Sequence, residues 1–137
     1  MISRSIFLLS TLIISVLSAA AQVPITIKNN WMYVDASFSY GWKDIPISAL
    51  IDTGASVCMM DSIFATDSCN IKIEKSNAVI GNTNGKKVAS FKFNLDSINL
   101  GGHKYYDVCC YILNLSGMFA QYAPKFIIWG DVLKRDY

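Results

Sequence analysis

Short runs in which apolar and polar residues alternate dominate the chain from residue 22 onward. Valine, isoleucine, threonine and aromatic residues fill these runs, which is typical of β-strands whose successive side chains point to opposite faces. Turn-forming residues such as Gly41 and the pair Gly101-Gly102 separate one run from the next. The pattern predicts strands over 25–27, 31–40, 45–51, 57–60, 77–81, 87–93, 97–100, 105–113 and 126–129.

Helical patterns are scarce in the same region. The polar stretch 61–70 has room for one helical turn, and 131–137 is expected to form a short helical tail that Asp131 caps. Residues 116–124 are expected to form a loop. Many short strands with almost no helix predict an all-β barrel or sandwich.

The first 21 residues have the layout of a secretory signal peptide. Arg4 gives a basic start, an apolar run follows over 6–17, and small residues fill 18–21. We therefore expect export to the periplasm or the extracellular space, with cleavage after Ala21. The alternative is an uncleaved membrane anchor, although the apolar run is shorter than the roughly 20 residues that a membrane span needs.

The remaining residues, 22–137, have the length of one domain. The whole chain carries 12 basic and 10 acidic residues, and removal of Arg4 leaves a net charge of only +1. A nearly neutral chain gives no electrostatic reason to bind nucleic acid or an anionic membrane.

Four cysteines, an even number, permit disulfides in an exported protein. We expect at least one disulfide, without a defined pairing, and the alternative is that Cys58 and Cys69 are buried thiols. Neighbours on a strand point to opposite faces, so Cys109 and Cys110 are not expected to bond each other. No C-x₂-C pair is present and His103 is the only histidine, so neither a metal nor another cofactor is expected.

The candidate catalytic segment is Asp52-Thr53-Gly54-Ala55-Ser56, which directly follows the apolar residues 49–51. A carboxylate at the end of a buried strand is costly unless neighbouring groups compensate it. Gly54 permits a sharp turn and a close approach, and the Thr53 hydroxyl is available for hydrogen bonds. The other interpretation is an ordinary capping aspartate between a strand and a turn.

This segment resembles the signature of retropepsin-like aspartic proteases, and the resemblance extends over residues 22–137. It implies a closed acid-protease barrel with a flap hairpin and a short C-terminal helix. The flap corresponds to Gly81, Asn82, Thr83, Asn84 and Gly85, and the loop support corresponds to Ile128, Trp129 and Gly130. Trp129 departs from the family pattern, which usually has an aliphatic residue there, and Ser56 stands where retroviral enzymes often have Asp.

The resemblance also implies that Asp52 is the catalytic acid of a homodimer that cleaves a peptide or protein substrate. Two carboxyl groups about 3 Å apart share one proton, and aspartic proteases are the reference example of this effect. The chain has one Asp-Thr-Gly and no internal repeat, so the second carboxyl group has to come from a symmetry mate.

Two other functions have weaker support in the sequence. Nucleophilic catalysis by a serine or cysteine would have to use His103, which lies in a glycine-rich turn without a fixed partner. An exported binding or scaffold protein that keeps the protease-like fold without cleavage is the alternative to the enzyme. The intact Asp52-Thr53-Gly54 favours the protease.

Overall fold

The structure, a computed structural model, describes residues 23–75, 78–83, 86–119, 123–129 and 132. The residues so described form one eight-stranded sheet with two short helical segments. The strands are β1 (Ile25–Lys28), β2 (Trp31–Tyr40), β3 (Lys43–Asp52), β4 (Cys58–Asp61), β5 (Ala78–Thr83), β6 (Lys86–Leu100), β7 (His103–Leu113) and β8 (Phe126–Trp129). The helical segments are the π-helix η1 (Phe64–Ser68) and the helix α2 (Ser116–Phe119).

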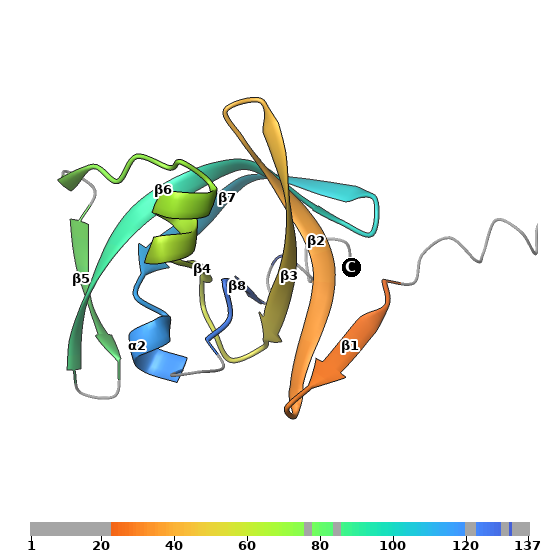
Figure 1. The fold of residues 1–137 in the computed structure, drawn as a ribbon, viewed down its shortest axis with the longest axis horizontal. Coiled ribbons are helices and arrows are strands. Elements are labelled where there is room, and N and C mark those ends of the chain that lie inside the picture. The colour runs from red at the N-terminus through yellow and green to blue at the C-terminus, as the bar shows by residue number, and fades with distance from the viewer. Residues whose placement is uncertain (1–22, 76–77, 84–85, 120–122, 130–131, 133–137) are drawn as a thin grey trace, which may run out of the picture.

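The sheet curls back on itself (Figure 1). Its strand order is β1-β2-β3-β8-β4-β7-β6-β5, and β2 pairs with β6 in addition. That pairing joins residues 36–39 to residues 97–100, so the contact that closes the ring is short. Strands β1 and β5 lie outside the ring as flanking strands. The expectation of an all-β, barrel-like fold is therefore confirmed.

Strand β8 lies at the centre of the core, between β3 and β4. Phe126, Ile127 and Ile128 are each at most 1% exposed. A strand that is covered on both faces requires a continuous apolar run, which is what this segment has. The ring of Phe126 stacks on Phe38 of β2 at a centroid distance of 5.8 Å. Full burial of one such side chain stabilises the fold by about 2 kcal/mol.

Three of the hairpin turns have two residues, both with positive φ, which is the type I′ geometry that suits the twist of paired strands. Glycine and asparagine tolerate this conformation best. They occupy all but one of the six positions, the exception being Trp42: Asn29 and Asn30, Gly41 and Trp42, Gly101 and Gly102.

Several predicted boundaries differ from the structure. The two strands predicted between residues 87 and 100 are one long strand, β6, and the predicted loop 116–124 contains the helix α2. The polar stretch after β4 forms the predicted helical turn, as η1. The predicted hairpin tip is tighter, because Thr83 already pairs with Lys86.

The two ends of the chain are described only in part. Of the predicted C-terminal helix, Val132 alone lies among the described residues, where it is helical and 3% exposed. The predicted signal peptide, 1–21, lies outside them. Within the part of the chain that the structure describes, no helix has the length and apolarity of a membrane span.

No disulfide joins the four cysteines, so the expectation of at least one is not met in this structure. Cys58, Cys69 and Cys110 are buried, and Cys109 is half-buried. Burial raises the pKa of the Cys110 thiol well above its ordinary value, and the neighbouring Cys58 and Cys109 raise it further. Burial also raises the pKa of Cys69, against a smaller lowering by the Lys125 charge. Burial and the raised pKa both disfavour the thiolate, which is the reactive form of these thiols.

Candidate active site

Asp52 is the last residue of β3, at the point where this strand leaves the core. Strand β3 runs parallel to β8 over three residue pairs, and Asp52 is paired with Trp129. Strand β8 lies between β3 and β4, so the connection 53–57 from β3 to β4 must pass over the carboxyl end of β8. The placement of Asp52 at the end of a core strand agrees with the prediction.

Hydrogen bonds within the loop hold the carboxylate. The backbone N–H of Gly54 donates to Asp52 Oδ1 at 2.9 Å, and the N–H of Ala55 donates to the Asp52 carbonyl oxygen at 3.3 Å. Ala55 is buried and anchors the loop, whereas Thr53, Gly54 and Ser56 are exposed. The carboxylate is therefore oriented by its own loop and is presented at the protein surface.

Gly54 makes its turn without a positive φ. A methyl group built on its Cα would have Asp52 Oδ1 as its nearest heavy atom outside the adjacent residues, at 3.4 Å. Any residue can adopt this backbone conformation, so the turn does not require glycine. The absence of a side chain instead leaves the space beside the carboxylate open.

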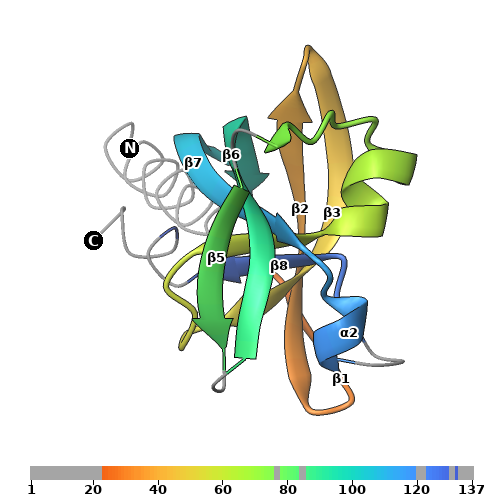
Figure 2. The same cartoon turned by 90° about the vertical axis from the view of Figure 1, so that its left-hand side faces the viewer.

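The predicted flap is a hairpin formed by β5 and β6. Gly81, Asn82 and Thr83 lie in β5, and Gly81 pairs with Val88 of β6. Asn84 and Gly85 lie outside the described residues. Figures 1 and 2 place the tip end of this hairpin, the helix α2 and the end of β3 at the same, lower end of the molecule. The flap residues and Asp52 thus share one end of the fold.

A small hydrophobic cluster lies beneath this end of the molecule, separate from the main core. Its buried members are Leu50, Leu113, Leu115 and Ile127, and partly buried side chains such as Val88 and Phe119 pack against them. These residues come from β3, β7, β8, the flap strand β6 and α2. The cluster therefore joins the strand that carries Asp52 to the flap and to α2.

The loop support is partly described. Ile128 is fully buried, Trp129 is partly buried against the main core, and Gly130 lies outside the described residues. The ladder between β3 and β8 places Ile128 and Trp129 opposite Ile51 and Asp52. Of the predicted support residues, these two are therefore brought to the Asp52 loop.

Asp61, which the sequence did not single out, is a second carboxylate that the fold depends on. It is only 7% exposed. Its Oδ2 accepts hydrogen bonds from the N–H groups of Ile63 and Phe64 at 3.1 and 3.2 Å, and Oδ1 accepts one from Leu115 at 3.1 Å. It caps the helical turn after β4 and ties that turn to the start of α2. The only sequence signal was an Asp directly before a predicted helical turn.

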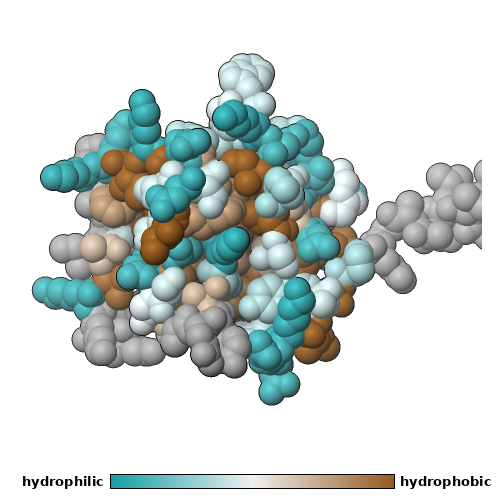
Figure 3. Space-filling view, in the orientation of Figure 1, coloured by the Kyte–Doolittle hydropathy of each residue, from teal (hydrophilic) through white to brown (hydrophobic). Residues whose placement is uncertain are grey.

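Apolar side chains are exposed around the same end. Trp31 and Met118 are 43% and 38% exposed, and the Trp31 ring contacts Phe119 edge-on at a centroid distance of 6.1 Å. Ile27, in the flanking strand β1, is 72% exposed. Figure 3 shows hydrophobic side chains reaching the edge of the molecule over β1, while elsewhere on this face they mix with hydrophilic ones. Among the residues that the structure describes, Trp31, Met118 and Ile27 thus leave apolar surface exposed at this end of the molecule.

A metal centre finds no support in the described part of the chain. No group of three or more His, Cys, Asp or Glu side chains that could hold an ion occurs there.

Comparison with known proteins agrees with this geometry. A family model described as aspartyl protease matches residues 36–122, which is more than half of the chain and includes Asp52. No curated protein matches the chain.

Solved structures with a similar fold include a retropepsin-like aspartic protease from Rickettsia conorii. It is 15% identical, with a TM-score of 0.56 over 83% of this chain and 78% of that one. The retroviral protease-like domain of Ddi1 from Leishmania major is 18% identical, with a TM-score of 0.44 over 77% of this chain and 74% of that one.

Proposed function

The chain belongs to the retropepsin-like aspartyl protease family, and from this premise we propose that it is an aspartic endopeptidase that acts as a homodimer. The observation that carries the proposal is the position of Asp52. It ends a core strand, its own Asp-Thr-Gly loop orients its carboxylate, and the space beside it is open.

In the proposed mechanism, the Asp52 carboxyl groups of two subunits share one proton. The ionised group takes a proton from a water molecule, which attacks the carbonyl carbon of the scissile peptide bond. The protonated group gives its proton to the carbonyl oxygen as the C=O double bond opens, which yields a tetrahedral diol. The proton taken from water then passes to the amide nitrogen as the C–N bond breaks, so the products are a carboxylic acid and an amine. No covalent intermediate forms with the enzyme, so no serine or cysteine nucleophile is required.

Dimerisation is proposed because one subunit contributes a single Asp-Thr-Gly motif. A twofold axis close to the exposed Thr53 and Gly54 would bring two Asp52 carboxylates together. The apolar side chains exposed at the same end, among them Trp31 and Met118, are suited to burial against a second subunit.

The flap and the export of the protein belong to the same proposal. The hairpin that contains Gly81, Asn82 and Thr83 is proposed to fold over the bound peptide and exclude water. Asn84 and Gly85, which follow Thr83 in the sequence, are included in this proposed flap. Residues 1–21 are proposed to direct the chain out of the cytoplasm before the dimer forms.

A digest of a peptide library tests the proposed activity. The purified protein is incubated at acidic and at neutral pH, with and without an aspartic-protease inhibitor, and the products are identified by mass spectrometry. We expect cleavage that the inhibitor abolishes and that the variant Asp52→Asn lacks. Saturable peptide binding without cleavage, under conditions where the protein is dimeric, would favour the non-catalytic binding protein instead.

A further inference from the structure

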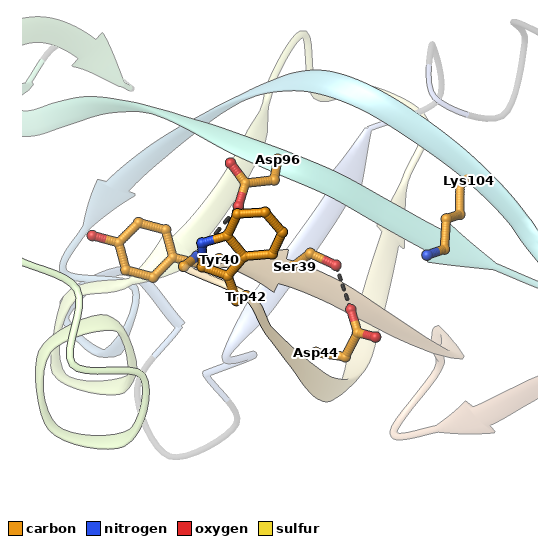
Figure 4. A pocket seen from close by; sticks show the side chains of 7 residues that line it. Ser39, Tyr40, Trp42, Asp44, Asp96 and Lys104 are labelled. Carbon is orange, nitrogen blue, oxygen red and sulfur yellow. Dashed lines mark hydrogen bonds between the residues drawn. The ribbon is translucent and has the colours of Figure 1, made fainter.

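A hollow of about 750 Å³ lies at the end of the molecule opposite Asp52. It is formed between the tip of the β2–β3 hairpin and the strands β6 and β7, and we refer to it as the hairpin-tip hollow. Its size is within the range of sites that bind small molecules or single side chains. Its lining residues are Ser39, Tyr40, Gly41, Trp42, Asp44, Asp96 and Lys104 (Figure 4).

Trp42 is the residue at this hollow that the fold does not explain. Its φ of 68° lies in the left-handed region, where the other type I′ turns have Asn30 or Gly102 at the same position. Its side chain is fully exposed, so it makes no contribution to the core. A large aromatic residue in a strained conformation, without packing in return, indicates a function in recognition.

Two carboxylates in the hollow are held in fixed positions. The N–H of Gly41 donates to Asp96 Oδ2 at 3.2 Å, and the Ser39 hydroxyl donates to Asp44 Oδ1. Within the described residues, the second oxygen of each carboxylate has no hydrogen-bond partner. Each acid therefore has an oriented acceptor available to a ligand.

These groups together have the chemistry that recognises a cation. The face of an indole or phenol ring attracts a positive charge, and carboxylate oxygens accept its N–H groups. Two acids and one base, Lys104, line the hollow, so its net charge is negative. Lys104 stands apart from the aromatic side chains in Figure 4, which leaves the aromatic side to the cation.

We propose that the hairpin-tip hollow binds a basic side chain, lysine or arginine, of a peptide segment. The guanidinium or ammonium group lies against the Trp42 indole and donates charge-assisted hydrogen bonds to the carboxylates of Asp44 and Asp96. Lys104 is then placed to donate to a carbonyl oxygen of the same segment.

This site is distinct from the one that contains Asp52. The two lie at opposite ends of β3, which has ten residues, and are therefore about 30 Å apart at roughly 3.3 Å per residue. The proposal does not depend on cleavage or on the dimer, because every residue that it uses belongs to one subunit.

Nuclear magnetic resonance titration of the ¹⁵N-labelled protein tests the proposal. The probe is N-acetyl-Gly-Arg-Gly-amide, and the matched neutral probe has Gln in place of Arg. We expect saturable shifts of the Gly41 amide and the Trp42 indole N–H, with at least tenfold tighter binding of the Arg peptide than of the Gln peptide.

Two variants test the residues of the hollow. Trp42→Gly keeps the backbone conformation, and Asp96→Asn keeps an acceptor for the Gly41 N–H. Each variant should weaken binding of the Arg peptide at least fivefold. The control variant Asp67→Asn, outside the hollow, should leave the affinity for the Arg peptide unchanged.

Several results would overturn the proposal. Equal binding of the Arg and Gln peptides would exclude recognition of the cation. Saturable binding of a neutral sugar such as maltose, without a response to the Arg peptide, would assign the hollow to glycans. Unchanged binding in Trp42→Gly, or no shift with any probe, would show that the exposed indole is not a recognition element.

Discussion

Asp52 and Trp129 are the last registered pair of the parallel ladder between β3 and β8. The ladder ends where the Asp-Thr-Gly loop begins, so the position of the carboxylate depends on a strand about 75 residues later in the chain. Trp129 packs partly buried against the main core directly at this point. It is therefore a support for the Asp52 loop, and its large side chain sets the shape of that support.

Truncation of this support should destabilise the protein. Trp129→Ala is expected to lower the free energy of unfolding by about 3 kcal/mol, because a partly buried aromatic side chain is replaced by a cavity. Chemical denaturation measures the change. The control is Trp42→Gly, which removes an exposed indole at positive φ and should be neutral or stabilising by about 1 kcal/mol. Equal losses in both variants would contradict the role given to Trp129.

Gly54→Ala separates folding from function. The added methyl group is in ordinary contact with Asp52 Oδ1 at 3.4 Å and the backbone φ is open to any residue, so stability should change by less than about 0.5 kcal/mol. Cleavage should fall at least about a hundredfold, because the methyl group occupies the space beside the carboxylate where substrate has to approach. Thermal unfolding and peptide cleavage are measured on the same preparation. Full activity would mean that substrate does not approach along Gly54.

Asp61→Asn should destabilise the fold. Both carboxylate oxygens accept backbone N–H groups, so one of these donors would face an amide NH₂ whichever way the new side chain turns. We expect a loss of about 2 kcal/mol in chemical denaturation. The matched control is Asp67→Asn in η1, which is exposed and should stay within about 0.5 kcal/mol of the wild type. A similar small effect at both positions would contradict the structural role of Asp61.

Much of the fold followed from local patterns, and less followed where distant segments decide the outcome. Alternation predicted β2 with its observed bounds, and the apolar run 126–129 was correctly predicted as a buried strand. The continuity of β6 could not be read, because the consecutive polar residues Asp96 and Ser97 shift the alternation by one position. Pairing with β7 continues on both sides of this shift and holds the strand together. The role of Asp61 could not be read either, because one of its donors, Leu115, lies 54 residues away.

The same limit applies to the two sites. The motif Asp52-Thr53-Gly54 is contiguous, so its place at the end of a strand could be predicted from the sequence. The hairpin-tip hollow combines residues from four strands and becomes visible only when Gly41 is seen to meet Asp96, 55 residues away. Trp42 alone gave no signal, since a tryptophan between strands is ordinarily core.

Stability should fall at alkaline pH because of Cys110. Burial raises its pKa well above the ordinary value of 9.0, so the folded thiol keeps its proton where the unfolded thiol has lost it. Below pH 9 the Cys110 thiol is protonated in both the folded and the unfolded state, so its contribution to the free energy of unfolding is fully present. Above pH 9, ionisation of this thiol in the unfolded state lowers the free energy of unfolding by up to about 1.4 kcal/mol per pH unit. Denaturation at pH 8 and 10 should show a smaller loss in Cys110→Ala than in wild type. Cys109→Ala should keep most of the wild-type pH dependence, because it removes a smaller cause of the raised pKa of Cys110 and leaves the burial of that thiol in place.

The proposed mechanism requires the Asp52 carboxyl groups of both subunits. Asp52→Asn keeps an oxygen that accepts the Gly54 N–H, so the fold should remain, but the acid–base function is lost and cleavage should disappear. Because a heterodimer with wild type would contain one acid, an equal mixture should retain about one quarter of the wild-type activity after subunit exchange. Dilution of the wild type below its dimer dissociation constant should lower its specific activity as monomers accumulate. Activity that follows the wild-type fraction linearly, or that stays constant where sedimentation shows monomers, would mean that each chain cleaves alone and that the shared pair is not the mechanism.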